Sequence, residues 1–375
     1  MIKIIPVETK KDLQRFIKLP FRLYKNDPNW IPPLIMDMKT KFNPQKNPYY
    51  EHSQVQPFLA ERNGKIIGRI TAQTNTQHNK AHNDKVGFFG FFESIDDQKV
   101  PDKLFETAYN WLQKKDCDTM RGPMNLSVND ECGLLIDGFD SPPYVLMTHN
   151  KKYYVNLIEK SGLSKKMDLY AYKVPVTKAP ERIEKLAKKL EKRGKFTIRS
   201  LSTRKAQLKE DIKTTFEIYT KAWENNWGDV PMTKSEFDNI VKEMLIYVRP
   251  EFVYIAEVDG KPAGFSLTLP DYNFVLKKMN GYLFPIGIFK ALYYKNKVTR
   301  LRVIAMGVIK EYKNRGIDIA FYAKSFETAN NHRIKWTEAE FSWILENNKI
   351  MNRIAKNLGG VIHKTYRIYD KKIAY

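Results

Sequence analysis

The chain has 375 residues, a hydrophobic fraction of 42% and a formal net charge of +22. This length predicts two domains, and the apolar fraction is large enough to fill two cores. The charge favours a polyanionic partner, such as nucleic acid, anionic lipid, an acidic carrier protein or a phosphate-rich cofactor, without choosing among them. Two cysteines and six histidines without metal-ligand spacing exclude a disulfide framework and predict no metal site.

No stretch of the sequence has the long apolar run that secretion or membrane spanning requires. We therefore expect no transmembrane segment and a soluble, cytoplasmic protein. The residues do not determine an oligomeric state.

The first element with a clear signature is a hairpin at residues 58–68, FLAERNGKIIG. Its Asn63-Gly64 dipeptide supplies the positive φ that a tight turn needs. Residues 254–264, YIAEVDGKPAG, repeat the pattern A-E-x-x-G-K-x-x-G with a turn at Asp259-Gly260. The sequence therefore predicts two equivalent hairpins.

A second pair of segments, at nearly the same separation, supports an internal repeat. These are GLSKKMDLYAY from Gly162 and GGVIHKTYRIY from Gly359, which we interpret as the closing strands of two copies of one α/β unit. Between the copies, Pro180 and Gly194 bracket a predicted linking helix. We place the domains at residues 1–177 and 178–375.

The first copy contains a polar, turn-rich insertion at residues 121–143, RGPMNLSVNDECGLLIDGFDSPP. A long ordered loop is commonly functional, and this acidic one could receive a cationic acceptor amine. The alternative is a loop that satisfies its own backbone through Asx turns.

The second copy contains an apolar insertion near residues 274–298, with GYLFPIGIF followed by KALYYKNK. It is too short to span a bilayer. We expect a buried helix that packs between the domains. The alternatives are a cover for a long acyl chain or a membrane-surface contact through Lys290, Lys295 and Lys297.

A phosphate-binding loop is predicted at VIKEYKNRGID, residues 308–318, where a strand ends and a helix begins. The free N–H groups of a helix start bind anions, Lys313 and Arg315 add positive charge, and Gly316 lets the backbone approach a diphosphate. With NKIMNRIAKNLG at residues 348–359, and with the order of strands and helices in each half, this segment resembles the GNAT superfamily of N-acyltransferases.

The resemblance covers nearly the whole chain as a tandem. It implies an α/β fold with mixed (α+β) sheets in two tandem GNAT-like domains, and an acetyl-coenzyme A or longer acyl-coenzyme A donor without a metal. The positions that it implies for binding this cofactor are Val308, Lys313, Asn314, Arg315, Gly316, Ile317, Asp318 and Asn348.

Three positions depart from the superfamily pattern. Asp318 replaces a small residue, and its carboxylate repels phosphate unless the side chain turns outward as a helix cap, which we favour. The first copy reads DDQKVPDKL at residues 96–104, without a glycine, and is expected to be a degenerate domain unable to hold coenzyme A. Ala355 stands where the superfamily often has a tyrosine acid.

Acyl transfer to an amine requires a base for the incoming ammonium and an acid for the leaving thiolate. In WTEAEFSW, residues 336–343, period-2 alternation places Glu338 and Glu340 on one strand face. We predict one of them as the base, the alternative being that both face solvent or pair with Arg or Lys. Tyr366 or Tyr369 is the candidate acid, the alternative being a core position.

The predicted function is therefore an N-acyltransferase that moves an acyl group from acyl-coenzyme A to a small-molecule or peptide amine. Two alternatives stay open at this point. The donor could be an acyl carrier protein or an aminoacyl-tRNA, or the chain could be a basic binding protein that keeps the fold without the chemistry.

Overall fold

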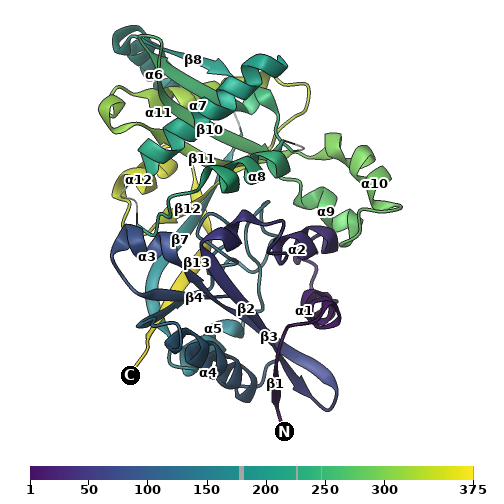
Figure 1. Ribbon diagram of the computed structural model, residues 1–375. Helices are drawn as coiled ribbons and strands as arrows, with labels where there is room; N and C mark the ends of the chain where they lie inside the picture. The colour runs from purple at the N-terminus through teal and green to yellow at the C-terminus, as the bar shows by residue number, and fades with distance from the viewer. Residues whose placement is uncertain (177–180, 225–226, 246, 375) are drawn as a thin grey trace. The chain divides into compact units, whose positions relative to one another are not determined.

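The computed structural model describes residues 1–176, 181–224, 227–245 and 247–374 (Figure 1). These residues form two compact units. Unit 1 contains Met1–Tyr170, Val275–Leu292 and the residues from Lys364 onward, and unit 2 contains Ala171–Phe274 and Tyr293–His363. The domain boundary predicted at 177/178 lies outside the described residues and stays a prediction.

Unit 1 is built on a mixed sheet with the strand order β1-β2-β3-β4-β5-β13-β7, and β6 pairs with β13. Strands β1 to β4 form an antiparallel meander, whereas β4 and β5 are parallel and connected by α4. The elements are β1 Lys3–Pro6, α1 Lys10–Leu23, α2 Ile35–Lys41, β2 Ser53–Arg62, β3 Lys65–Asn75, α3 Thr76–His82, β4 Val86–Ser94, α4 Lys99–Gln113, β5 Thr119–Gly122, β6 Leu134–Asp137, α5 Tyr154–Lys160, β7 Ser164–Pro175 and β13 Val361–Lys372. The residues of β7 from Ala171 onward and of β13 up to His363 are counted in unit 2.

Helices cover both faces of the unit 1 sheet, because its strands alternate apolar side chains between the two sides. Phe58 and Ala60 of β2 pack with α4 and α5, while Leu59 between them packs with α1 and α2. A strand such as β2 therefore contributes side chains to the hydrophobic cores on both faces of the sheet, as expected for a sheet between two layers of helices.

Unit 2 repeats this arrangement with the order β7-β12-β11-β10-β9-β8. Strands β8 to β11 are antiparallel, and β11 and β12 are parallel with α11 between them. One face of the unit 2 sheet packs against α11, and the other face packs against α7. The elements are α6 Glu181–Gly194, β8 Phe196–Ser200, α7 Lys205–Trp223, α8 Lys234–Met244, β9 Val253–Val258, β10 Lys261–Pro270, β11 Arg300–Val308, α11 Ile317–Asn331, β12 Glu338–Leu345 and α12 Lys349–Asn357.

The two predicted hairpins are confirmed as equivalent elements of the repeat. Ala60 pairs with Gly68 in β2–β3, and Ala256 pairs with Gly264 in β9–β10. Both turns have positive φ at their two central residues, at Asn63-Gly64 and Asp259-Gly260. The local turn chemistry therefore sets the same register in each unit, and the α/β fold with mixed sheets is confirmed.

The insertion after β10 forms α9 Asn273–Met279, α10 Gly287–Tyr294 and a 3-10 turn at Lys295–Lys297. The expectation of a buried helix is wrong for this segment, because Phe284 is 65% and Phe289 is 70% exposed. An apolar sequence pattern shows that a face is hydrophobic, but it does not show what covers that face.

Candidate functional site

Unit 2 has an open sheet edge where its two parallel strands separate. Strands β11 and β12 pair only from Arg300↔Glu338 to Val303↔Phe341. Beyond these residues β11 continues to Val308, still paired with β10 on its other side. Its residues 303–308 are half-buried, although they are apolar and lie inside a sheet. Backbone N–H and C=O groups on this edge are therefore available to an extended ligand.

The corresponding gap in unit 1 is filled by the chain itself. The residues of β4 are all buried, and the pairing with β5 ends at Phe88↔Arg121. Beyond that point Met124 N–H donates to Phe89 O at 2.8 Å, and Phe91 N–H donates to Asn125 Oδ1 at 2.8 Å. A Cβ on Gly90 would lie 1.8 Å from the carbonyl oxygen of Met124. No ligand chain fits between these strands.

The filling segment belongs to the polar insertion at residues 121–143, whose side chains largely satisfy the loop itself. Asn129 N–H donates to Ser127 Oγ at 3.1 Å, and Asn125 Nδ2 donates to Glu131 Oε2 at 3.2 Å. Lys41 pairs with Asp130 at 2.9 Å. This is the self-satisfied loop that the sequence left open as an alternative.

The predicted phosphate loop follows β11 directly, after Val308. Lys313, Asn314 and Arg315 are exposed, and Gly316, with a φ of 84°, is the N-cap residue of α11. The N–H groups of Ile317 and the following residues thus open the helix. The Ile317 side chain is 1% exposed and packs in the core, so only its backbone is available to an anion.

Two details of this loop differ from the sequence-based expectation. Gly316 rather than Asp318 is the cap residue, because the left-handed turn ends at the glycine; Asp318 lies in the first turn, half-buried. A Cβ on Gly316 would also lie 2.4 Å from Leu190 Cδ1 of α6. Close packing by α6 is therefore one reason for glycine at this position.

Asn348, which the resemblance places near the cofactor, caps α12. Its Oδ1 accepts a hydrogen bond from Met351 N–H at 3.1 Å. Asn352 on the same helix donates to Leu345 O at 2.9 Å, which fixes the end of β12 against the helix. Ala355 is buried at 1% exposure and offers no acid.

Glu340 lies at the centre of a buried polar cluster in unit 2. It is 0% exposed, and Oε2 accepts a hydrogen bond from His363 Nε2 at 2.7 Å. Its Oε1 lies 3.8 Å from Arg302 Nε, which itself donates to Ser342 Oγ at 2.7 Å. Oε1 has no hydrogen-bond partner in the described part of the chain. A buried carboxylate oxygen without a hydrogen bond can accept a proton from a bound ammonium.

The other two predicted catalytic residues have different surroundings. Glu338 is partly exposed and has distant ion-pair contacts of 3.9 Å with Lys173 and Arg300. Glu338 thus pairs with bases, as the alternative reading of the sequence proposed. Tyr366 is 0% exposed and belongs to unit 1, whereas the two glutamates belong to unit 2. Its role as the acid stays a prediction.

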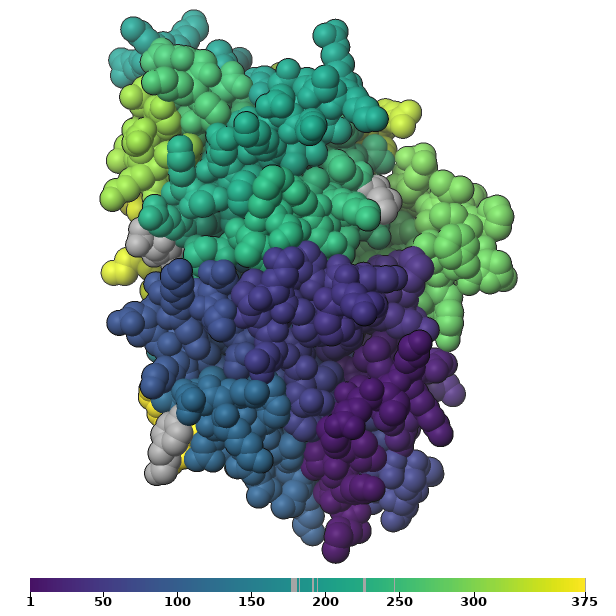
Figure 2. All heavy atoms as spheres, in the orientation of Figure 1, coloured from purple at the N-terminus to yellow at the C-terminus, as the bar shows by residue number. Residues whose placement is uncertain are grey.

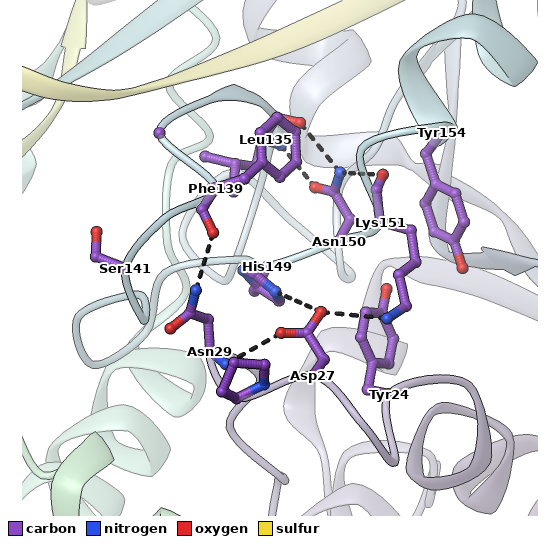
Figure 3. Close-up of polar contacts among 12 residues, drawn as sticks. Tyr24, Asp27, Asn29, Leu135, Phe139, Ser141, His149, Asn150, Lys151 and Tyr154 are labelled. Atoms are coloured by element: carbon purple, nitrogen blue, oxygen red, sulfur yellow. Dashed lines mark hydrogen bonds and ion pairs between the residues drawn. The ribbon is translucent and has the colours of Figure 1, made fainter.

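Unit 1 contains a polar cluster that the sequence did not indicate (Figure 3). Asp27 Oδ2 lies 3.2 Å from His149 Nε2 and 3.2 Å from Lys151 Nζ, and Asn29 N–H donates to its Oδ1 at 3.0 Å. His149 is 4% exposed in its side chain, and Nδ1 has no hydrogen-bond partner among the described residues. Because Asp27 accepts from Nε2–H, the free lone pair lies on Nδ1.

A buried carboxylate lies near this cluster. Glu93 Oε2 accepts from the hydroxyls of Tyr24 and Tyr154 at 2.8 and 2.7 Å, and Arg69 lies 3.5 Å from its other oxygen. Burial raises the pKa of Glu93, and it also raises the pKa values of Tyr24 and Tyr154. The two tyrosines therefore keep their protons at neutral pH and donate hydrogen bonds to the Glu93 carboxyl group.

The burial of His149 makes the stability of the protein depend on pH. Burial lowers the pKa of His149, although the contact with Asp27 acts in the opposite direction. The unfolded chain therefore binds more protons below its own histidine pKa of about 6.5, and the free energy of unfolding falls as the pH drops through that value. We expect His149→Gln to reduce this slope by up to ~1.4 kcal/mol per pH unit.

Urea unfolding at several pH values on both sides of the histidine pKa measures this slope. His78, whose pKa burial also lowers, is expected to keep part of the dependence in the variant. An unchanged slope in His149→Gln would show that His149 is protonated equally in both states.

Within the ranges that the structure describes, no cluster of histidine, cysteine, aspartate or glutamate is arranged to hold a metal ion. No described helix is long and apolar enough to cross a membrane.

Comparison with solved structures identifies the class of fold. A tandem GNAT protein from the clavulanic acid biosynthesis pathway aligns with a TM-score of 0.59, covering 100% of this chain and 99% of its own at 10% identity. An N-acetyltransferase from Sphaerobacter thermophilus aligns with a TM-score of 0.54, covering 99% of this chain and 96% of its own at 12% identity. The chain therefore has the tandem GNAT acyltransferase fold.

Sequence relatives define the family more narrowly. The bacterial ceramide synthase of Caulobacter vibrioides is 37% identical over 380 residues, covering 99% of this chain and 98% of the relative. Protein YghO of Escherichia coli K12 is 37% identical over 371 residues, covering 97% and 94%. No protein-family profile matches the chain. The chain belongs to the family of the bacterial ceramide synthase and is an N-acyltransferase.

Proposed function

We propose that the protein transfers a fatty acyl group from acyl-coenzyme A to the primary amine of a long-chain amino alcohol. The observation that carries this proposal is the end-to-end match to a bacterial ceramide synthase, since a ceramide is the amide of a fatty acid and such an amine. The open edge of β11 in unit 2 supports a donor in extended form.

In this proposal the donor lies along β11 and ends at the loop after it. The pantetheine amides pair with the free backbone groups of residues 304–308, as an added strand pairs with a sheet edge. The diphosphate lies at the start of α11, a helix of 15 residues, where Lys313 and Arg315 supply positive charge. Val308, Asn314, Ile317 and Asp318 contribute backbone, and Asn348 orders α12 beside β12.

Glu340 acts as the general base in the proposed reaction. It takes a proton from the acceptor ammonium, and the freed nitrogen attacks the thioester carbonyl carbon. A C–N bond forms and the C–S bond breaks, and the coenzyme A thiolate leaves with the second proton that the amine nitrogen loses as it becomes the amide. Arg302 and His363 hold the carboxylate in place until the amine arrives.

A product assay tests the proposal. Purified protein is incubated with palmitoyl-coenzyme A and a sphingoid base, and the amide is detected by mass spectrometry. Acetyl-coenzyme A tests the acyl length, and a palmitoylated acyl carrier protein tests the alternative donor. Amide formed only from acetyl-coenzyme A would reject the long-chain donor, and amide formed only from the carrier protein would reject free acyl-coenzyme A.

The loop assignment makes a separate binding prediction. Gly316→Val should raise the Kd for coenzyme A by about tenfold or more, because a β-branched residue cannot keep the φ of 84° and the N–H groups at the helix start must shift. Calorimetry measures the Kd. Gly260→Val is the matched control, since Gly260 also has positive φ, at 74°, but has open space around it.

The double variant Gly316→Val/Leu190→Ala separates packing from binding. Removing the Leu190 side chain relieves the clash with α6 and should recover stability without recovering affinity. Undiminished coenzyme A binding in Gly316→Val would reject the loop assignment.

A further inference from the structure

The insertion between β10 and β11 exposes a group of large apolar side chains. Phe284, Ile286 and Phe289 are 65%, 64% and 70% exposed, and Figure 2 draws their segment in light green on the face shown. Scattered exposed apolar residues are ordinary, but a contiguous group marks an interaction surface. The other exposed members of the segment are Phe274, Tyr282, Leu292 and Tyr293.

Helix α10 arranges part of this group along one side. Leu292 and Tyr293 are three and four positions after Phe289, so the three side chains project from the same side of the helix. Large apolar side chains on the exposed side of this eight-residue helix gain nothing from contact with water. Its sequence therefore favours an apolar partner.

The base of the segment is anchored, so its exposure is not that of a loose loop. Ile35 N–H donates to Gly281 O at 3.0 Å, and Lys277 Nζ donates to Pro28 O. Val275 and Met279 are buried at 4% and 6% exposure. The apolar tip is thus held outward by a fixed stem.

The charges of the segment have one sign. Between Asp271 and Glu311 the sequence contains no acidic residue, whereas lysines occur at both ends of the apolar group. Lys297 Nζ lies 3.8 Å from the ring centroid of Tyr293, which places a cation directly beside the apolar face. The lysines are Lys277, Lys278, Lys290, Lys295 and Lys297.

We propose that residues 273–297 dock the protein on an anionic membrane surface. The aromatic and aliphatic side chains enter the boundary between headgroups and acyl chains, and the lysines other than Lys277, which anchors the stem, contact lipid phosphates. The absence of carboxylates in this stretch argues against a second copy of the chain as the partner, because two copies would bring like charges together. This inference goes beyond the proposed reaction and does not depend on it.

Vesicle co-sedimentation without any substrate tests the proposal. The protein is expected to bind phosphatidylcholine vesicles that contain about one third phosphatidylglycerol, and to bind pure phosphatidylcholine about tenfold more weakly or less. Added salt should weaken the binding to anionic vesicles. Equal binding to both vesicle types, or binding to neither, would overturn the proposal.

Substitutions at the apolar face test which residues enter the lipid. Phe289→Ser/Leu292→Ser should weaken vesicle binding about tenfold or more, because it removes two large apolar side chains that would be buried in the lipid. The matched single variants are Ile286→Ser and Ile350→Ser, at positions 64% and 63% exposed. Only the first should weaken binding; equal losses in both would show a non-specific effect and reject the surface.

A charge pair completes the test. Lys290→Glu/Lys295→Glu should weaken binding to anionic vesicles more than Lys65→Glu/Lys261→Glu, which makes the same change in net charge on two exposed hairpins. Equal effects would assign the binding to overall charge. Sedimentation velocity of the free protein tests whether a second copy of the chain covers this surface instead. If the wild type is a dimer, does not bind vesicles, and becomes a monomer in Phe289→Ser/Leu292→Ser, the partner is a second copy and the membrane proposal is rejected.

Discussion

Replacing Glu340 by glutamine should lower kcat by about 10²–10⁴-fold while the KM for acyl-coenzyme A changes little. The amide keeps the size of the side chain but cannot take a proton from the acceptor ammonium. Glu340 lies outside the phosphate loop, so donor binding should persist. Steady-state kinetics with both substrates varied measures the two parameters.

The pH dependence distinguishes a base from a structural residue. Near the pKa of the acceptor amine, the free amine is already present and the general base is no longer needed. The rate ratio between wild type and Glu340→Gln should therefore shrink as the pH rises. A ratio independent of pH, in a variant that still binds coenzyme A, would reject the general base.

Glu338→Gln is the internal comparison. It changes the same residue type on the same strand, at a partly exposed position whose ion-pair contacts are 3.9 Å long. The structure predicts a smaller loss of kcat for Glu338→Gln than for Glu340→Gln. A larger loss in Glu338→Gln than in Glu340→Gln would move the base to Glu338.

The repeat was predictable from the sequence because its signals are local. Turn dipeptides with positive φ fix the hairpins at Asn63-Gly64 and Asp259-Gly260, and strand alternation follows from them. The exposure of α10 was not predictable in this way. An apolar stretch has the same pattern whether it faces a core or a lipid surface, and only the fold shows which neighbours are present.

The candidate site was predictable in part for the same reason. Strand alternation selects Glu338 and Glu340, but only the sheet register places Arg302 opposite Glu340. Only the tertiary fold brings His363 within hydrogen-bond distance of Glu340. Asp27 and His149 are 122 positions apart and belong to no spacing motif. Residues that meet through tertiary structure leave no local trace in one sequence.

The cluster around Glu340 also predicts a large effect on stability. Arg302→Met should lower the free energy of unfolding by about 3–5 kcal/mol, because it leaves a buried carboxylate without its arginine. Arg302 is 1% exposed, and its guanidinium also lies 4.6 Å from the ring centroid of Trp343. Denaturant unfolding followed by tryptophan fluorescence measures the change.

The double variant Arg302→Met/Glu340→Gln tests the cause of that loss. Removing both charges leaves neutral side chains of similar length in the same space, so the double variant should recover much of the stability. Lys103→Met, which breaks an exposed pair with Glu106 at 2.9 Å, is the surface control and should cost about 1 kcal/mol or less. If the double variant is as unstable as Arg302→Met alone, the loss comes from packing against Trp343, and Arg302 does not hold the Glu340 charge.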